Sequence, residues 1–271
     1  LFGGSTMLGQ GSPDDFTIPS FLCRQLEAKH PETCWECKNF GIGGYVFTQE
    51  VVLFIKLLQT NRPNPDLVIF YDGVNDFIAS LQGYPNDHHN FTRIRDTFEN
   101  RPAPISKRLL NLLPNISNLI RGFLNKPELS KENKTLIRKN LLRSSKIYKF
   151  NYQLLNDIAS SKKIKVITTF QPTIYSKIFL SDYESWHLEN FNYDTFTNEQ
   201  LRPLWDFYYT NVVSENLRPL SNNIFIDLTQ AFDGAKHSVY YNPGDWMHVN
   251  WNGNLRVAKA LSKHMTTLID P

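Results

Sequence analysis

The sequence predicts an α/β protein: a three-layer α/β/α sandwich around a central, mostly parallel sheet, with an inserted helical cap. Three observations carry this prediction. The chain has 271 residues, of which 41% are hydrophobic, so it is long enough to bury a large core. Short apolar runs rich in β-branched residues are typical of strands buried on both faces of a parallel sheet. Segments with helical periodicity alternate with these runs, as a layered α/β fold requires.

The predicted strands and helices follow each other along the chain. The strands are expected at residues 66–71, 163–170 and 223–228. The helices are expected at residues 17–29, 48–60, 136–160 and 253–268. Thr17 opens the first helix, and Pro19 lies early in its first turn, where proline is tolerated. The alternation implies right-handed crossovers between parallel strands.

We interpret residues 1–271 as one domain with two segments outside a minimal α/β core. Residues 83–135 contain five prolines and much of the basic charge, and we interpret them as an inserted cap. Pro114 must kink the amphipathic run 105–124 within it. Residues 175–209 form an aromatic-rich insertion. Its aromatics either line a sugar-binding groove or pack the cap onto the core, and packing is the favoured interpretation.

The net charge of +3 hides an uneven distribution. Residues 101–163 carry a balance of +11, whereas the remainder of the chain carries −8. Lys139, Arg143 and Lys146 follow i, i+4, i+7 spacing and share one face of the predicted helix, next to Arg138 and Lys149. This face is either a solvated surface or a site that attracts an anionic polymer or a membrane surface. We expect no nucleic-acid partner.

The three cysteines and the first residues of the chain bear on the cellular compartment in which the protein is found. Cys34 and Cys37 have no second Cys or His pair at zinc-finger spacing, so we expect no metal site. One disulfide from Cys23 to Cys34 or Cys37 would suit an oxidising compartment, and three buried thiols would suit the cytosol. The chain opens at Leu1 with no room for the strand that should precede Ser5, so we expect upstream residues to be missing.

Four segments together supply the parts of a serine-nucleophile site. They are Phe2-Gly-Gly-Ser-Thr-Met7, Asn39-Phe-Gly-Ile-Gly-Gly44, Asp72-Gly-Val-Asn-Asp76 and Asp245-Trp-Met-His248. A serine hydroxyl needs a nearby base, and His248 is the candidate to remove the proton from Ser5. Asp245 precedes His248 by three residues, so one tight turn would bring its carboxylate to the other imidazole nitrogen.

The remaining parts would stabilise negative charge on the attacked carbonyl oxygen. The backbone N–H groups of Ser5 and Gly44 and the side-chain amide of Asn75 are the expected donors. Each would follow a strand of the sheet, and ligands of open α/β folds bind at the carboxyl ends of strands.

The four ordered segments resemble those of the SGNH (GDSL-type) hydrolase superfamily. Its invariant residues match Ser5, Gly44, Asn75 and His248, and its last block matches Asp245 through His248. One departure is that Gly4 replaces the Asp of the Gly-Asp-Ser motif. The resemblance implies an SGNH hydrolase-like, flavodoxin-like fold. The Phe-Gly-Gly-Ser-Thr form is similar to bacterial members that are exported or anchored by an N-terminal segment, which implies an extracytoplasmic location.

The expected function is ester hydrolysis without a cofactor. The resemblance implies removal of an O-acyl group, for which we favour acetyl on a carbohydrate, through an acyl-enzyme on Ser5. An O-acyltransferase would use the same serine to acylate a glycan. A third alternative is a non-catalytic module that binds a polysaccharide or a membrane surface.

Overall fold

The computed structural model describes residues 1–60, 63–85, 87, 130–193, 196–214, 217–242 and 245–269. Its centre is a five-stranded sheet in which every neighbouring pair is parallel. The strand order is β2-β1-β3-β4-β5, the order of flavodoxin-like doubly wound folds. The strands are β1 Phe2–Gly3, β2 Phe40–Gly41, β3 Leu67–Asp72, β4 Lys165–Phe170 and β5 Asn223–Asp227.

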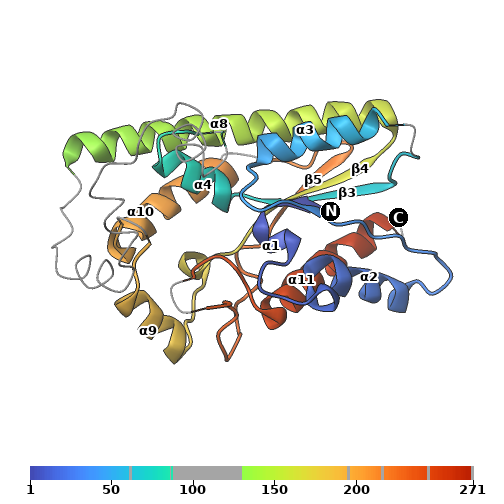
Figure 1. Ribbon diagram of the computed structural model, residues 1–271. Coiled ribbons are helices and arrows are strands. Elements are labelled where there is room, and N and C mark those ends of the chain that lie inside the picture. Colours follow the sequence, from blue (N-terminus) through green and yellow to red (C-terminus); the bar gives the residue numbers. More distant parts are fainter. Residues whose placement is uncertain are drawn as a thin grey trace, which may run out of the picture.

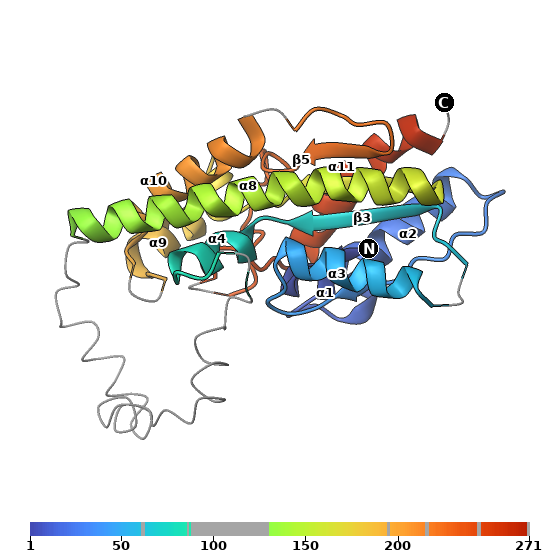
Figure 2. The same cartoon turned by 90° about the horizontal axis from the view of Figure 1, so that it is seen from above.

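Helices cover both faces of the sheet, which confirms the three-layer prediction (Figure 1). On one face lie α3 (Phe47–Leu58) and α8 (Lys131–Lys162), and on the other lie α2 (Ile18–Lys29) and α11 (Trp251–Ile269). Helix α8 runs along the whole length of the sheet (Figure 2). The predicted helix at 136–160 was too short, because α8 begins at Lys131, where the Ser130 side chain accepts a hydrogen bond from Asn133 N.

The strand before Ser5 exists, so the expectation that the chain leaves no room for it was wrong. Phe2 and Gly3 pair with β2 on one side and β3 on the other. The ring of Phe2 is stacked between Phe40 and Phe70, with centroids 5.1 and 5.0 Å away. Because such cross-strand aromatic pairs stabilise a sheet, two residues are enough to fix this central strand.

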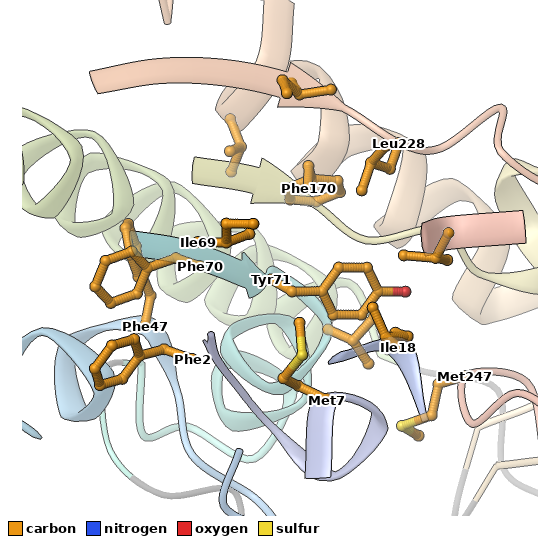
Figure 3. Close-up of a cluster of buried hydrophobic side chains, with 14 of the residues drawn as sticks. Phe2, Met7, Ile18, Phe47, Ile69, Phe70, Tyr71, Phe170, Leu228 and Met247 are labelled. Carbon is orange, nitrogen blue, oxygen red and sulfur yellow. The ribbon is translucent and has the colours of Figure 1, made fainter. Parts of the chain in front are cut away.

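The core lies on both sides of β3 and β4. Val68 to Asp72 and Val166 to Phe170 are buried without interruption. Figure 3 shows Phe2, Met7, Phe70, Tyr71 and Met247 within one cluster of buried side chains. Such continuous burial is the reason that apolar runs, and not alternating patterns, mark these strands.

The segment after β3 is helical. Helix α4 spans Val74–Leu81, and all eight of its residues are buried. It packs against α8 and fixes Asn75 in its first turn. The short helix α1 (Ser5–Leu8) likewise starts at Ser5.

The two segments outside the minimal core have different outcomes. Most of the predicted cap at 83–135, including Pro114 and the run 105–124, lies outside the described residues, and 131–135 belong to α8. The aromatic segment forms α9 (Asp182–Asn190) and α10 (Asn198–Tyr209). Tyr175, Trp205 and Tyr208 are buried in the core.

The cysteines form one disulfide, between Cys23 and Cys37. Cys34 is free and exposed, so the alternative with three buried thiols was wrong. Within the described part of the chain, no helix is both long and apolar enough to cross a membrane.

Candidate active site

Three neighbouring strands end at the candidate site. Ser5 follows β1, Gly44 follows β2, and Asn75 follows β3. Because β1 connects outward to β2 while β3 continues the sheet on its other side, the strand order reverses between β1 and β3. Such a switch point opens a crevice at the carboxyl ends of parallel strands. The fold therefore brings together three segments that are far apart in the sequence.

Ser5, His248 and Asp245 form a continuous hydrogen-bond chain. Ser5 Oγ lies 2.6 Å from His248 Nε2, and His248 Nδ1 lies 2.7 Å from Asp245 Oδ2. Asp245 Oδ1 accepts hydrogen bonds from the backbone N–H groups of Met247 and His248. The carboxylate thus fixes both the turn that carries the imidazole and the orientation of its ring. This geometry can activate a serine hydroxyl as a nucleophile.

The candidate oxyanion donors surround the same serine. Asn75 Nδ2 donates one hydrogen bond to Tyr45 O at 2.7 Å, and a primary amide has a second hydrogen to offer. Gly44 has a φ of 81°, a left-handed conformation that favours glycine. The backbone N–H of Ser5 is at the first position of α1, where no acceptor exists within the helix.

These groups line a pocket of about 390 Å³. Its walls include the polar side chain of Gln10, the apolar side chains of Ile78 and Met247, and the ring of Tyr193. Gln10 was not singled out from the sequence, because no spacing links it to the four segments. Tyr193 belongs to the aromatic segment 175–209, for which a sugar-binding groove was one of the two interpretations. Among the described residues, no group of three His, Cys, Asp or Glu side chains is arranged to hold a metal ion.

The structure explains why glycine occupies position 4. A Cβ atom added to Gly4 would overlap Asn75 Nδ2. The amide of Asn75 therefore lies against the bare backbone just before Ser5, in space that any side chain at position 4 would need. Asn39 ties the second segment to the first, since its amide nitrogen donates to Met7 O at 3.0 Å and its oxygen accepts from Gly41 N.

Trp246 anchors the turn between Asp245 and His248. Its side chain is 2% exposed and is surrounded by four aromatic rings from other parts of the chain. These rings, at centroid distances of 5.2 to 6.2 Å, belong to Phe77, Tyr175, Tyr193 and Trp205. Trp246 O also accepts a hydrogen bond from Ile174 N. The aromatic segment 175–209 therefore packs against the turn that carries Asp245 and His248.

Three buried carboxyl groups lie on elements next to Gly44 and Asn75 in the chain. Glu50 is on α3, Asp72 ends β3 and Asp76 follows Asn75 on α4. Asp76 Oδ2 accepts a hydrogen bond from Phe47 N at the start of α3. Glu50 and Asp72 interact directly with each other. A signal was available in the sequence, because Glu50 shares the apolar helical face of Phe47, Val51 and Phe54.

Burial raises the pKa of all three groups. Loss of hydration is the largest cause, and it raises the pKa of Asp76 to about 7. For Glu50 and Asp72, burial and the neighbouring carboxylates raise the pKa well above the usual range. At neutral pH the trio therefore holds protons that the unfolded chain would release.

This trio predicts a pH-dependent stability difference. Because the folded state binds more protons, these groups lower stability as pH rises from the ordinary carboxyl range, about 4, through the folded-state values. Glu50→Gln removes one titratable carboxyl group and gives Asp72 an amide donor. We expect its melting temperature, relative to wild type, to rise between pH 5 and pH 8. Thermal unfolding at both pH values checks this, with the exposed Glu27→Gln as the control. A pH-independent difference between Glu50→Gln and wild type would contradict it.

Comparisons with known proteins support the fold. No family model matches this chain, and no curated protein sequence does. Among solved structures, it is similar to the lipase Lip_vut3 from a goat rumen metagenome, with 12% sequence identity and a TM-score of 0.55 over 97% of this chain and 94% of that one. It also matches LAE5, described as an alpha/beta hydrolase enzyme from the metagenome of Lake Arreo in Spain, with 15% identity and a TM-score of 0.49 over 98% and 94%. The likeness to Lip_vut3 shows a shared fold along nearly the whole chain.

Proposed function

We propose that this protein is a serine ester hydrolase of the SGNH type. The observation that carries the proposal is the hydrogen-bond chain from Ser5 through His248 to Asp245, at 2.6 and 2.7 Å, beside a pocket with three candidate oxyanion donors. The fold is shared with a protein described as a lipase, a class that acts on esters. The four ordered segments of the sequence support the SGNH assignment.

In the proposed reaction, Ser5 Oγ attacks the ester carbonyl carbon while His248 Nε2 takes the hydroxyl proton. The carbonyl oxygen becomes an oxyanion that accepts hydrogen bonds from Ser5 N, Gly44 N and Asn75 Nδ2. Asp245 stabilises the imidazolium through Nδ1. When the ester C–O bond breaks, His248 returns the proton to the departing alkoxide, and the acyl group remains on Ser5.

The second half of the reaction repeats these roles with water. His248 takes a proton from the attacking water, the oxyanion forms again, and collapse expels Ser5 Oγ, which regains its proton. The products are a carboxylic acid and the alcohol whose hydroxyl group had carried the acyl group. An acceptor sugar in place of water would make the same site an O-acyltransferase.

For the substrate we propose an O-acetyl ester of a carbohydrate. The preference for acetyl and for a sugar rests on the resemblance of the sequence, and Tyr193 is an aromatic residue among those that line the pocket, of the kind on which sugars stack. The test is turnover of acetylated oligosaccharides with and without an excess of unacetylated acceptor. Released acetate supports hydrolysis, an acetylated acceptor supports transfer, and neither product would favour a non-catalytic binding module.

Asn75→Ala tests the oxyanion role. The amide should act where charge develops, so the variant should lower kcat about 100 to 1,000-fold with a smaller change in KM. Asn64→Ala, which removes an exposed amide before the amino end of β3, whereas Asn75 follows its carboxyl end, serves as the control. Steady-state kinetics on a small neutral ester measure both constants. A defect confined to KM would instead make Asn75 a substrate-positioning residue.

We propose that the basic face of α8 attracts an anionic polymer or membrane surface. Lys139, Arg143 and Lys146 are exposed on this helix, whereas Arg138 lies over the ring of Phe207 at 5.3 Å. Such attraction is screened over about 8 Å at physiological ionic strength.

Salt dependence tests this face. Turnover of a polymeric anionic ester should weaken between about 50 and 500 mM salt, while turnover of a small neutral ester hardly changes. Replacing Lys139, Arg143 and Lys146 together with Gln should flatten the polymer response. Equal responses of the two substrates would leave a solvated surface as the account of these charges.

We also propose an extracytoplasmic location, periplasmic or secreted, with anchoring by an N-terminal segment as one form of it. The Cys23–Cys37 disulfide supports an oxidising compartment. Fractionation of the native host tests the location, and non-reducing peptide mapping of the recovered protein tests the disulfide.

A further inference from the structure

A buried ion pair lies next to the candidate site and takes no part in the proposed chemistry. Lys177 Nζ lies 2.5 Å from Glu184 Oε2, and the two side chains are 0% and 1% exposed. Lys177 follows the turn after β4, and Glu184 is in the first turn of α9. Oε2 also accepts a hydrogen bond from Ser181 N at 2.8 Å, which caps α9.

The other oxygen of Glu184 connects this pair to the segment that pairs with His248. Glu184 Oε1 accepts a hydrogen bond from Val239 N at 3.3 Å. On the next residues, Tyr240 bridges Val249, and Tyr241 N donates to His248 O at 3.0 Å. Val239 O accepts from Asn250 N at 2.8 Å. Segment 239–241, called the clamp below, is thus paired with residues 248–250. The carboxylate of Glu184 in turn holds Val239 of the clamp in place.

The turn of Asp245 and His248 is therefore held at two ends by different means. At the Asp245 end, Trp246 lies in its aromatic cage and accepts from Ile174 N. At the His248 end, the clamp is held by its own hydrogen bonds and by Glu184. Loss of the second anchor alone would leave Asp245 in place, and His248 would then be held by its two hydrogen bonds to that carboxylate.

The contribution of such a buried ion pair to the stability of the fold does not by itself explain why the pair is present. Removing two charges from water costs free energy that their attraction often fails to offset, and apolar replacement of a whole buried pair is frequently neutral or stabilising. Loss of one partner, in contrast, leaves an unpaired buried charge. A geometric role accounts for the pair, because Lys177 holds one oxygen of the Glu184 carboxylate while the other oxygen accepts the hydrogen bond from Val239 N.

We propose that Lys177 and Glu184 are positioning residues that hold the 239–241 clamp and thereby align His248 Nε2 with Ser5 Oγ. This inference rests on the proposed function and deepens it. Lys177 neutralises and orients the carboxylate of Glu184. Glu184 in turn fixes the position of Val239 through the hydrogen bond that it accepts from Val239 N. Neither side chain touches the substrate.

The test replaces the whole pair, Lys177→Met with Glu184→Leu, so that no buried charge is left unpaired. We expect a folded protein whose kcat is about 10 to 100-fold lower, the scale expected for misalignment of reacting groups. KM should change little, because the pocket walls remain. Active-site titration with a phosphonate ester, carried to its end point, counts the serines that can react, and circular dichroism measures folding separately, so that a loss of folded protein cannot pass for a loss of kcat.

A matched control removes another buried polar pair that touches neither part of the clamp. Ser144 Oγ lies 3.2 Å from Tyr208 Oη between α8 and α10. Ser144→Ala with Tyr208→Phe should keep kcat per titrated site. A second variant loosens the clamp elsewhere: Asn250→Asp keeps the oxygen that accepts from Gly253 N but loses the donor to Ser238 O and Tyr240 O. It should also lower kcat per titrated site.

The outcomes separate the two claims. Wild-type protein that titrates, together with both clamp variants at full kcat per site, would overturn the positioning role and leave the proposed function intact. The positioning role would also be overturned, with the proposed function intact, if the variant with Lys177→Met and Glu184→Leu did not fold and Asn250→Asp kept full kcat per titrated site. Wild-type protein that neither titrates nor turns over any ester would overturn the proposed function, and the positioning role with it. A lowered kcat in the clamp variants but not in the control supports the proposal.

Discussion

Replacing Ser5 with alanine should lower ester turnover by roughly three or more orders of magnitude while the fold stays intact. The reason is that Ser5 Oγ is the atom held at 2.6 Å from His248 Nε2, and an alanine has no group to accept the acyl chain. Residual turnover would come from the oxyanion donors and from binding alone. Initial rates on a small ester, with circular dichroism to verify folding, give the measurement.

Ser161→Ala is the control for the Ser5 variant, because Ser161 is an exposed serine on α8. It should keep wild-type turnover. If Ser5→Ala turned over ester at a rate near that of wild type, another residue would be the nucleophile.

Trp246→Ala should be the most destabilising substitution near the site, by about 3 to 5 kcal/mol. Trp246 is enclosed by four rings, so truncation leaves a cavity that these neighbours cannot fill. The melting temperature should fall on the order of 10 °C. Turnover should fall as well, because the turn from Asp245 to His248 loses its anchor.

A surface tryptophan provides the control. Trp186 is 45% exposed on α9, and Trp186→Ala should change the melting temperature far less. Thermal unfolding of both variants checks the prediction. Equal melting temperatures for the two would contradict the anchoring role of Trp246.

Local patterns explain why much of the site was predictable from sequence. Asp245 and His248 are three residues apart, so one turn determines their contact. Ser5, Gly44 and Asn75 each follow a strand, and parallel strands present their carboxyl ends at one edge. The strand runs near 67–72, 165–170 and 223–227 were visible because a sheet covered on both faces needs continuous apolar residues.

The parts that were missed depend on tertiary contacts. Strand β1 has two residues, too few for a pattern, and is fixed by the stacking of Phe2 between Phe40 and Phe70. The segment after Gly73 is a helix that packs against α8, and the four residues Gly-Val-Asn-Asp alone do not predict this helix. Nothing in the spacing of Lys177 and Glu184 predicts a link to Val239.

The central claim is that Ser5 is a nucleophile activated by His248. The most direct measurement is mass spectrometry of the protein after treatment with a phosphonate ester that reacts with activated serines. We predict one added phosphonyl group per chain, mapped to the peptide that contains Ser5, and no addition in His248→Gln under the same conditions. An unmodified wild-type protein, or modification at another residue with Ser5 intact, would contradict the account.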